Sequence, residues 1–203
     1  RADPALALRS QLAQHPLAAL PPGGRNVLLA VGKAALPMMR EALQLLPDAG
    51  PALVITNPEN HAELPAAQVI CGAHPVPDET SAAAGQAAID LVHDLGPDDR
   101  LIALISGGGS ALMVAPAAGL TLADKAQVNQ LLLASGMDIS DMNLIRQQLS
   151  QLKGGGLLHH AAPARVEAFI LSDVIGDDLR AIASGPTVAP MGTPTQAQSL
   201  LQA

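Results

Sequence analysis

The sequence predicts an α/β protein with an open, doubly wound, mainly parallel sheet and helices on both faces, of the Rossmann-like kind. Five short, nearly continuous apolar runs alternate with longer stretches whose apolar residues recur every three or four positions. Such alternation of strands and amphipathic helices is typical of doubly wound sheets. The strands carry apolar residues at consecutive positions, which favours a parallel sheet buried on both faces.

The expected elements follow one another from end to end. Strands are predicted at 27–31, 52–56, 68–72, 101–106 and 166–173. Helices are predicted at 33–46, 79–94, 121–135, 140–152 and 155–162, and another helix begins near the C-terminal end. Asp78 is expected to cap the second helix, and Asp124 suits the first turn of the third. Ligands bind at the carboxyl ends of strands in such sheets, so a functional site is expected among the loops there.

Composition narrows the classes of function. With 203 residues, 49% hydrophobic and 14% charged, the chain can bury the core of one domain. The net charge is −7 and Phe169 is the only aromatic residue. A nucleic-acid partner is not expected, because neither a basic face nor stacking side chains are available.

The chain shows no sign of secretion or membrane insertion. Cys71 is the only cysteine, which excludes an internal disulfide and favours a cytoplasmic setting. Residues 101–123 are uncharged, but three glycines and Pro116 argue against a spanning helix. The first residues lack a signal-peptide core. Because the chain starts without Met and stops within a helical pattern, we expect it to be a fragment of a longer protein.

The loop after the fourth predicted strand reads "SGGGS", comprising Ser106, Gly107, Gly108, Gly109 and Ser110. Glycines let consecutive N–H groups point into one concavity that binds an anion, and the two serines can add hydroxyl donors. The plainer interpretation is a flexible turn. A Walker loop is excluded because no lysine follows the glycines, and a leucine occupies the third glycine of the dinucleotide fingerprint. The sequence therefore predicts a phosphate-binding loop of another type.

Lysines are scarce and two of the three lie beside glycine. Lys33 falls between the first strand and the next helix, where a cation is unfavourable unless an anion shares the site. We therefore predict that Lys33 is functional and faces the "SGGGS" loop, if the first and fourth strands are neighbours. Lys125, by contrast, is expected to be a solvated charge on a helix face.

The segment "NLIRQQLSQLKGGG" supplies further candidates for binding phosphate or carboxylate. Asn143, Arg146 and Ser150 are spaced three and four apart, which places them on one helical face. Lys153 follows, and with Arg146 it can reach an anion. The plainer interpretation is a surface helix with a glycine C-cap, which explains one glycine rather than three.

Acidic residues follow the fifth predicted strand in "SDVIGDD". Clustered carboxylates repel unless a cation compensates, and Mg²⁺ binds one or two carboxylates together with substrate phosphates. Asp173 is the better metal candidate and Asp177 the second, although Asp177 or Asp178 can instead cap a helix at "LRAIA". In "AHPVPDE", two prolines can hold His74 in place as a candidate for binding phosphate or substrate, and His74 and Asp173 are weak candidates for a general base.

Five stretches together resemble the N-terminal domain of the glycerate 2-kinases, a family often labelled hydroxypyruvate reductases in tartrate-degradation operons. They are "VGKAA", "AHPVPDE", "LISGGGSALMVAP", "NLIRQQLSQLKGG" and "SDVIGDDLRAIASGPT". They span residues 31 to 187 in the family's order. One departure is visible: the family's usual "VRKHLS" reads "IRQQLS" here, so Gln147 and Gln148 replace a basic residue and a histidine.

The resemblance implies ATP-dependent phosphorylation of D-glycerate at its 2-hydroxyl with Mg²⁺, and Lys33 as the catalytic candidate. It also implies a second, C-terminal domain, absent here, that completes the active-site cleft. Without it we expect no activity. The residues themselves agree in kind, because phosphoryl transfer needs positioned cations and a metal more than covalent chemistry. No general base is obvious, and we leave a homodimer open as the assembly.

Two other classes of function remain open at this point. One is an NAD(P)H-dependent hydroxypyruvate reductase, which the missing dinucleotide fingerprint opposes. The other is a non-catalytic domain that binds phosphosugars, because such domains share serine- and glycine-rich loops at strand ends.

Overall fold

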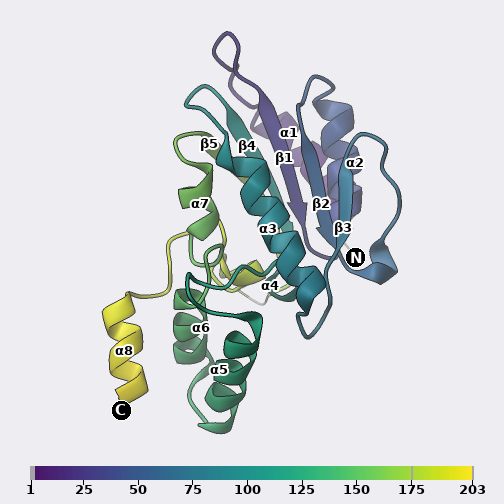
Figure 1. The fold of residues 1–203 in the computed structure, drawn as a ribbon. Coiled ribbons are helices and arrows are strands. Elements are labelled where there is room, and N and C mark those ends of the chain that lie inside the picture. Colours follow the sequence, from purple (N-terminus) through teal and green to yellow (C-terminus); the bar gives the residue numbers. More distant parts are fainter. Residues whose placement is uncertain (1–2, 175, 203) are drawn as a thin grey trace.

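The computed structural model describes residues 3–174 and 176–202 as a five-stranded sheet of order β3-β2-β1-β4-β5, with helices packed around it (Figure 1). The strands are β1 (Asn26–Val31), β2 (Ala52–Thr56), β3 (Gln68–Cys71), β4 (Arg100–Ser106) and β5 (Arg165–Leu171). Every neighbouring pair is parallel. The predicted fold class is confirmed, and each strand begins and ends within two residues of its predicted bounds.

The central strands are buried on both sides, as their apolar runs predict. Every residue of β2 and β4 is buried, and so is every residue of β1 after the first. Helices α1 (Pro4–Gln14) and α2 (Ala35–Leu45) cover one face of the sheet. Helices α3 (Glu79–His93), α4 (Gly109–Leu112) and α7 (Gly156–Ala161) cover the other. The predicted cap of α3 is confirmed, because the Asp78 side chain accepts hydrogen bonds from two backbone amides of its first turn.

Helix α1 was not predicted from the sequence. Asp3 caps it by accepting a 2.9 Å hydrogen bond from the Ala5 amide, and proline stands at its first position. Arg9 of α1 donates two hydrogen bonds to the buried Glu41 of α2, which fastens α1 to the sheet layer. Leu8 of the same helix is buried in the core on this face of the sheet, so apolar packing and the ion pair both hold α1.

Three helices form a separate group beyond the carboxyl edge of the sheet, at the bottom of Figure 1. They are α5 (Leu122–Ala134), α6 (Ile139–Gln148) and α8 (Pro194–Gln202), and they share a small core of their own. The remaining elements are the 3-10 helices η1 (Pro58–Asn60) and η2 (Ile182–Ser184). Helix α6 ends four residues earlier than predicted, so Ser150 lies outside it and forms a β-bridge with Pro116. The predicted helical face of Asn143, Arg146 and Ser150 is therefore wrong for Ser150.

None of the helices in the described ranges is long and apolar enough to cross a lipid bilayer.

Candidate functional site

The loops after β1 and β4 meet at the point where the strand order reverses. Val31 pairs with Ile105 at the carboxyl ends of these strands. Just beyond, the Lys33 amide donates a 2.9 Å hydrogen bond to the Gly107 carbonyl oxygen. The expected adjacency of the first and fourth strands is confirmed. This is the crevice where open parallel sheets bind their ligands.

Lys33 lies against the middle of the glycine loop, as we name residues 106–110. Gly108 has φ +88°, a left-handed conformation that favours glycine, and it caps the short helix α4. A Cβ added to Gly108 would stand 3.2 Å from Lys33 Cγ and 3.5 Å from His74 Cδ2. Lys33 and His74 are both exposed, so they flank the loop from the solvent side. The predicted orientation of Lys33 towards the loop is confirmed, while its catalytic role stays a prediction.

The other two glycines are required for close packing. A Cβ on Gly107 would overlap the carboxylate of Asp173. A Cβ on Gly109 would stand 2.7 Å from the Cβ of Ala183, a distance too short for two carbon atoms. Each glycine of the loop therefore admits a different neighbour: Asp173, Lys33 or Ala183. The sequence explains the triplet only as a flexible or anion-binding turn, because these neighbours are distant in the chain.

The two serines of the loop use their hydroxyls inside the protein. Ser106 is 2% exposed, and its Oγ accepts from the Ala34 amide at 3.1 Å and donates to the Val31 carbonyl at 3.3 Å. It therefore holds the Lys33 loop in place. The Ser110 hydroxyl pairs with that of Ser184 at 2.7 Å. Sequence reasoning did not single out Ser184, although it lies in the "ASGPT" stretch.

Glu59, in η1 after β2, is a site residue that the sequence did not reveal. Hydrogen bonds from its own backbone amide and from the Asn57 side chain hold the pKa of Glu59 below its ordinary value. Electrostatic interactions with His74 and Lys33 lower the pKa of Glu59 further, so the three groups lie in one electrostatic neighbourhood. The "TNPEN" loop follows the carboxyl end of a predicted strand, and that position was the one sequence feature that could have indicated Glu59.

The acidic segment after β5 brings one carboxylate to the glycine loop. Asp173 is exposed and its oxygens lie directly over Gly107. Asp177 is also exposed, with φ +53°. Asp178 instead pairs with Arg180 at 3.0 Å and accepts from its backbone amide, closing a turn where an α-helix was the alternative expectation.

The carboxylates near the glycine loop suit a metal ion that also binds phosphate oxygens. Within residues 3–174 and 176–202, no three His, Cys, Asp or Glu side chains gather into a metal-binding group. Mg²⁺ needs only one or two protein carboxylates when phosphate oxygens and water complete its shell. Asp173 offers one carboxylate beside a loop that suits a phosphate, and without a cation the two would repel. Asp173 therefore fits such an ion, with Asp177 as the second candidate.

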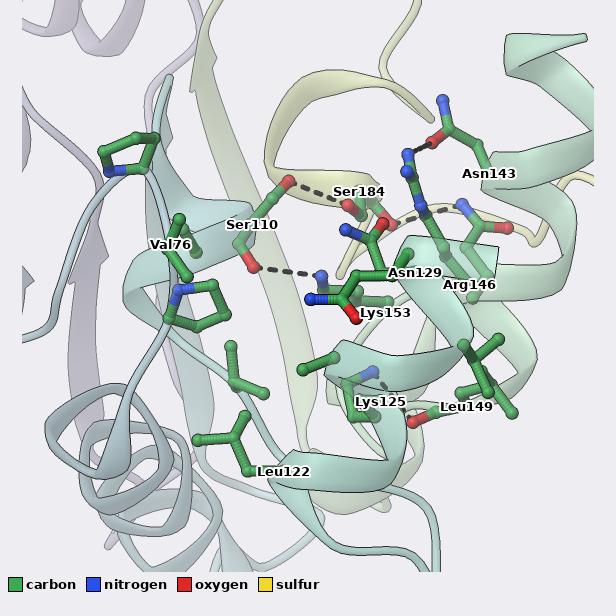
Figure 2. Close-up of a pocket in the computed structure, with 18 of the residues that line it drawn as sticks. Val76, Ser110, Leu122, Lys125, Asn129, Asn143, Arg146, Leu149, Lys153 and Ser184 are labelled. Atoms are coloured by element: carbon green, nitrogen blue, oxygen red, sulfur yellow. Dashed lines mark hydrogen bonds between the residues drawn. The ribbon is translucent and has the colours of Figure 1, made fainter. Parts of the chain in front are cut away.

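A cavity of about 580 Å³ opens next to the glycine loop, between α4 and the α5–α6 pair (Figure 2). Asn143, Arg146 and Lys153 line it together with Ser110, so the structure brings these four predicted residues to one place. Lys153 Nζ donates a 2.9 Å hydrogen bond to the Ser110 carbonyl, which joins the cavity to the loop. Arg146 Nη1 donates to Asn143 Oδ1 at 3.2 Å.

Lys125 also lines this cavity, which corrects the expectation of a solvated lysine on a helix face. It is only partly exposed, and its ammonium donates a 2.9 Å hydrogen bond to the Leu149 carbonyl. Burial lowers the pKa of Lys125 to about 8. Burial also lowers the pKa of Lys153 to about 7, with added repulsion from Lys125 and Arg146. The sequence missed Lys125 because it follows helical spacing and no glycine adjoins it.

The glycines after Lys153 dock the chain onto residues 184 and 185. The amides of Gly154 and Gly155 donate to the carbonyls of Ser184 and Gly185 at 3.0 and 2.8 Å, and both glycines have positive φ. Gln147 is buried and donates from Nε2 to the Ser184 carbonyl at 3.2 Å. These bonds hold Ser184 in the left-handed region, with φ +63°. Gly154 and Gly155 thus position a wall of the cavity.

The fold is that of an α/β protein with a parallel sheet, and comparison with known proteins identifies its family. The chain belongs to the family described as "Domain of unknown function (DUF4147)", whose model matches residues 1–203. The suspected kinship with glycerate kinases is confirmed. The chain is 37% identical over 180 residues to the D-glycerate 2-kinase of Thermotoga maritima and 48% identical over 152 residues to the glycerate kinase of Rattus norvegicus. It is 51% identical over 168 residues to a protein of Agrobacterium vitis named putative hydroxypyruvate reductase.

Solved structures support the same relationship. The crystal structure of a glycerate kinase from Thermotoga maritima superposes with a TM-score of 0.90 at 34% identity, over 98% of this chain and 47% of that one. The match to the Agrobacterium relative covers 82% of this chain and 43% of that protein. The match to the Thermotoga kinase covers 88% of this chain and 43% of that protein. For the rat kinase the shares are 74% and 28%. The chain thus spans less than half the length of these relatives.

Proposed function

We propose that this chain is the N-terminal, Rossmann-like domain of an ATP-dependent glycerate 2-kinase, and that it supplies one side of the active-site cleft. One observation carries the proposal: Lys33 lies against the left-handed Gly108 at the switch point of the sheet, in a chain related to glycerate kinases. A second domain elsewhere in the gene product would complete the cleft, since the chain spans less than half of its relatives.

Lys33 would neutralise charge on the transferring phosphoryl group. In the proposed reaction the 2-hydroxyl oxygen of D-glycerate attacks the γ-phosphorus, the bond to the β-phosphate oxygen breaks, and ADP leaves while the hydroxyl proton is released. The negative charge on the equatorial oxygens then needs a positioned cation. Lys33 is exposed, its amide donates to the Gly107 carbonyl, and the Ser106 hydroxyl holds the backbone on either side of it.

Asp173 would hold Mg²⁺ beside the same loop, with Asp177 as a second carboxylate. The ion would supply charge neutralisation to the phosphates. Asp173 itself would be a ligand of the ion, and only a glycine at position 107 leaves room for its carboxylate. His74 and Glu59 border Lys33 and would shape the field around the reacting groups.

Asn143, Arg146 and Lys153 would bind an anionic part of the reactants next to the loop. Guanidinium and ammonium groups recognise carboxylate and phosphate oxygens by charge-assisted hydrogen bonds. Ser110 and Ser184 form the boundary between the two parts of the site, through their paired hydroxyls.

The test is turnover by the gene product that contains this chain. D-Glycerate, ATP and Mg²⁺ should give ADP, and ³¹P NMR should show the phosphomonoester of 2-phosphoglycerate rather than 3-phosphoglycerate. The 203-residue chain alone should be inactive, because a cleft with one side cannot exclude water. Oxidation of NADH by hydroxypyruvate without ATP turnover would overturn the proposal in favour of a reductase, and binding of sugar phosphates without turnover would favour a binding domain.

A further inference from the structure

The cavity of Figure 2 combines several cations with no carboxylate to balance them. Its charged lining residues are Lys125, Arg146, Lys153 and Arg180, and none of the described lining residues is Asp or Glu. Arg180 is paired with Asp178 at 3.0 Å. Within the described chain, no salt bridge includes any of the other three. Like charges so close together are unfavourable unless an anion joins them.

The three unpaired cations also keep unused donors. Lys125 and Lys153 each donate one hydrogen bond to a backbone carbonyl, and an ammonium has three N–H groups. Arg146 Nε is buried and has no hydrogen-bond partner within the described residues. A buried, unpaired N–H of a charged group costs free energy unless a ligand satisfies it. The donors come from α5, α6 and the segment after α6, so they surround the space between these elements.

The rest of the lining suits a ligand with a polar end. Asn129 and Asn143 present amides on the cationic side, whereas Val76 and Leu122 belong to an apolar wall (Figure 2). The volume of about 580 Å³ falls in the range of small-molecule sites.

We infer that Lys125, Arg146 and Lys153 form one oxyanion subsite, adjoining the glycine loop but distinct from it, with Lys125 as a binding residue for a phosphate or carboxylate. This deepens the proposed function and rests on it for the identity of the reactant. The oxyanion belongs either to the phosphates of the nucleotide or to the carboxylate of the acid. Both groups would bridge the three cations and remove the repulsion between them.

The subsite should take up a proton when it binds its anion. The pKa of Lys153 is about 7 because of burial and the nearby Lys125 and Arg146, so much of it is neutral above pH 7. A bound oxyanion favours the protonated form and raises that pKa. Affinity should therefore fall as pH rises from about 6.5 to about 8.5. Arg180, paired with Asp178, is the other charged group on the lining.

The experiment measures binding by titration calorimetry with three probes: tripolyphosphate, ADP and D-glycerate. Lys125→Gln should lower the affinity for tripolyphosphate at least tenfold. The same variant should also lower the affinity for either ADP or D-glycerate, and the reactant affected identifies the source of the oxyanion. Arg40→Gln is the matched control, since it removes one exposed positive charge from α2, and it should change each affinity less than twofold. Lys125→Arg should restore much of the loss.

Three results would overturn the inference: no binding of tripolyphosphate to the unaltered protein at millimolar concentration, a change below twofold in Lys125→Gln, or an equal loss in Arg40→Gln. Thermal melts of Lys125→Gln and Arg40→Gln show whether each variant still folds. Together with the Lys125→Arg result, they distinguish an effect of the lost charge from an effect of unfolding. Failure of the proposed function would look different. Turnover of ATP and glycerate would then be absent, while tripolyphosphate binding would still depend on Lys125.

Discussion

The glycine loop and the cationic cavity adjoin at Ser110, yet they are built in opposite ways. The loop site consists of strand ends: Lys33 after β1 and residues 106–110 after β4, held by backbone hydrogen bonds and by glycines that admit close neighbours. The cavity consists of long cationic side chains from α5, from α6 and from the segment that follows α6. Lys33 is exposed, whereas Lys125 and Lys153 are partly buried with lowered pKa values. One site is therefore shaped by backbone hydrogen bonds and glycines, whereas the neighbouring site is shaped by cationic side chains that the helices partly bury.

The largest expected effect lies in the loop site. Lys33→Ala in the gene product should lower kcat by about a hundredfold or more, about 3 kcal/mol, because one positioned cation on the phosphoryl group is lost. Stability should barely change, since the side chain is exposed. Lys33→Arg should rescue only in part, because a planar fork does not replace a point charge. Near-normal turnover in Lys33→Ala, measured by ADP release, would remove Lys33 from the chemistry.

A second variant tests whether the loop is a binding loop or only a turn. Gly108→Val should raise KM for the nucleotide by at least about tenfold, because the side chain would crowd Lys33 and strain a left-handed position. Gly119→Val is the control: its φ is +83° and a Cβ there meets nothing within 4 Å. Both variants should lose about 1–2 kcal/mol of stability from the strained φ. Equal KM values in the two variants would reduce "SGGGS" to a turn.

The metal assignment gives a smaller effect at the same loop. Asp173→Asn should raise the Mg²⁺ concentration for half-maximal turnover by about tenfold, because the ion loses a charged ligand. The fold should persist, since Asp173 is exposed. Circular dichroism and a Mg²⁺ titration of turnover check both statements. An unchanged Mg²⁺ requirement would leave Asp173 as a structural neighbour of Gly107 and pass the metal hypothesis to Asp177.

The smallest expected effect concerns Lys153 in the cavity and the dependence of stability on pH. Burial lowers the pKa of Lys153 from 10.5 to about 7, so between these values the unfolded chain binds a proton that the folded chain lacks. The free energy of unfolding therefore rises with pH across this window. Lys153→Met should remove this rise. Relative to the unaltered chain it should be more stable by about 1 kcal/mol near pH 6, and the difference should narrow towards about pH 10.

Urea denaturation at several pH values measures this difference. Arg40→Met is the control, because that exposed side chain carries no comparable burial. A difference between Lys153→Met and the unaltered chain that stays constant from about pH 6 to about pH 10 would show that the Lys153 ammonium remains solvated.

The amino-acid sequence by itself determined the sheet and the placement of the loop site. Five apolar runs predicted five strands, and in β1, β2 and β4 burial on both faces accounts for the continuous local pattern. Parallel strands end at one edge of the sheet, so the sequence predicted Lys33 beside the "SGGGS" loop on the condition that the first and fourth strands are neighbours, and the structure shows that they are. Helix α1 was not predicted because its apolar residues form only a weak helical pattern, and its pairing of Arg9 with Glu41 joins residues far apart in the chain.

Only the tertiary structure decided which neighbours the glycines admit and which cations share the cavity. Asp173 meets Gly107 across 66 positions of the chain, a contact that no local spacing encodes. Lys125 follows an ordinary helical pattern, yet the packing of α5 beside α6 buries it in the cavity that Lys153 also lines, and burial lowers the pKa of both. The reason is physical: hydrophobic periodicity depends on residues close in sequence, whereas the burial of a charge depends on every element packed around it.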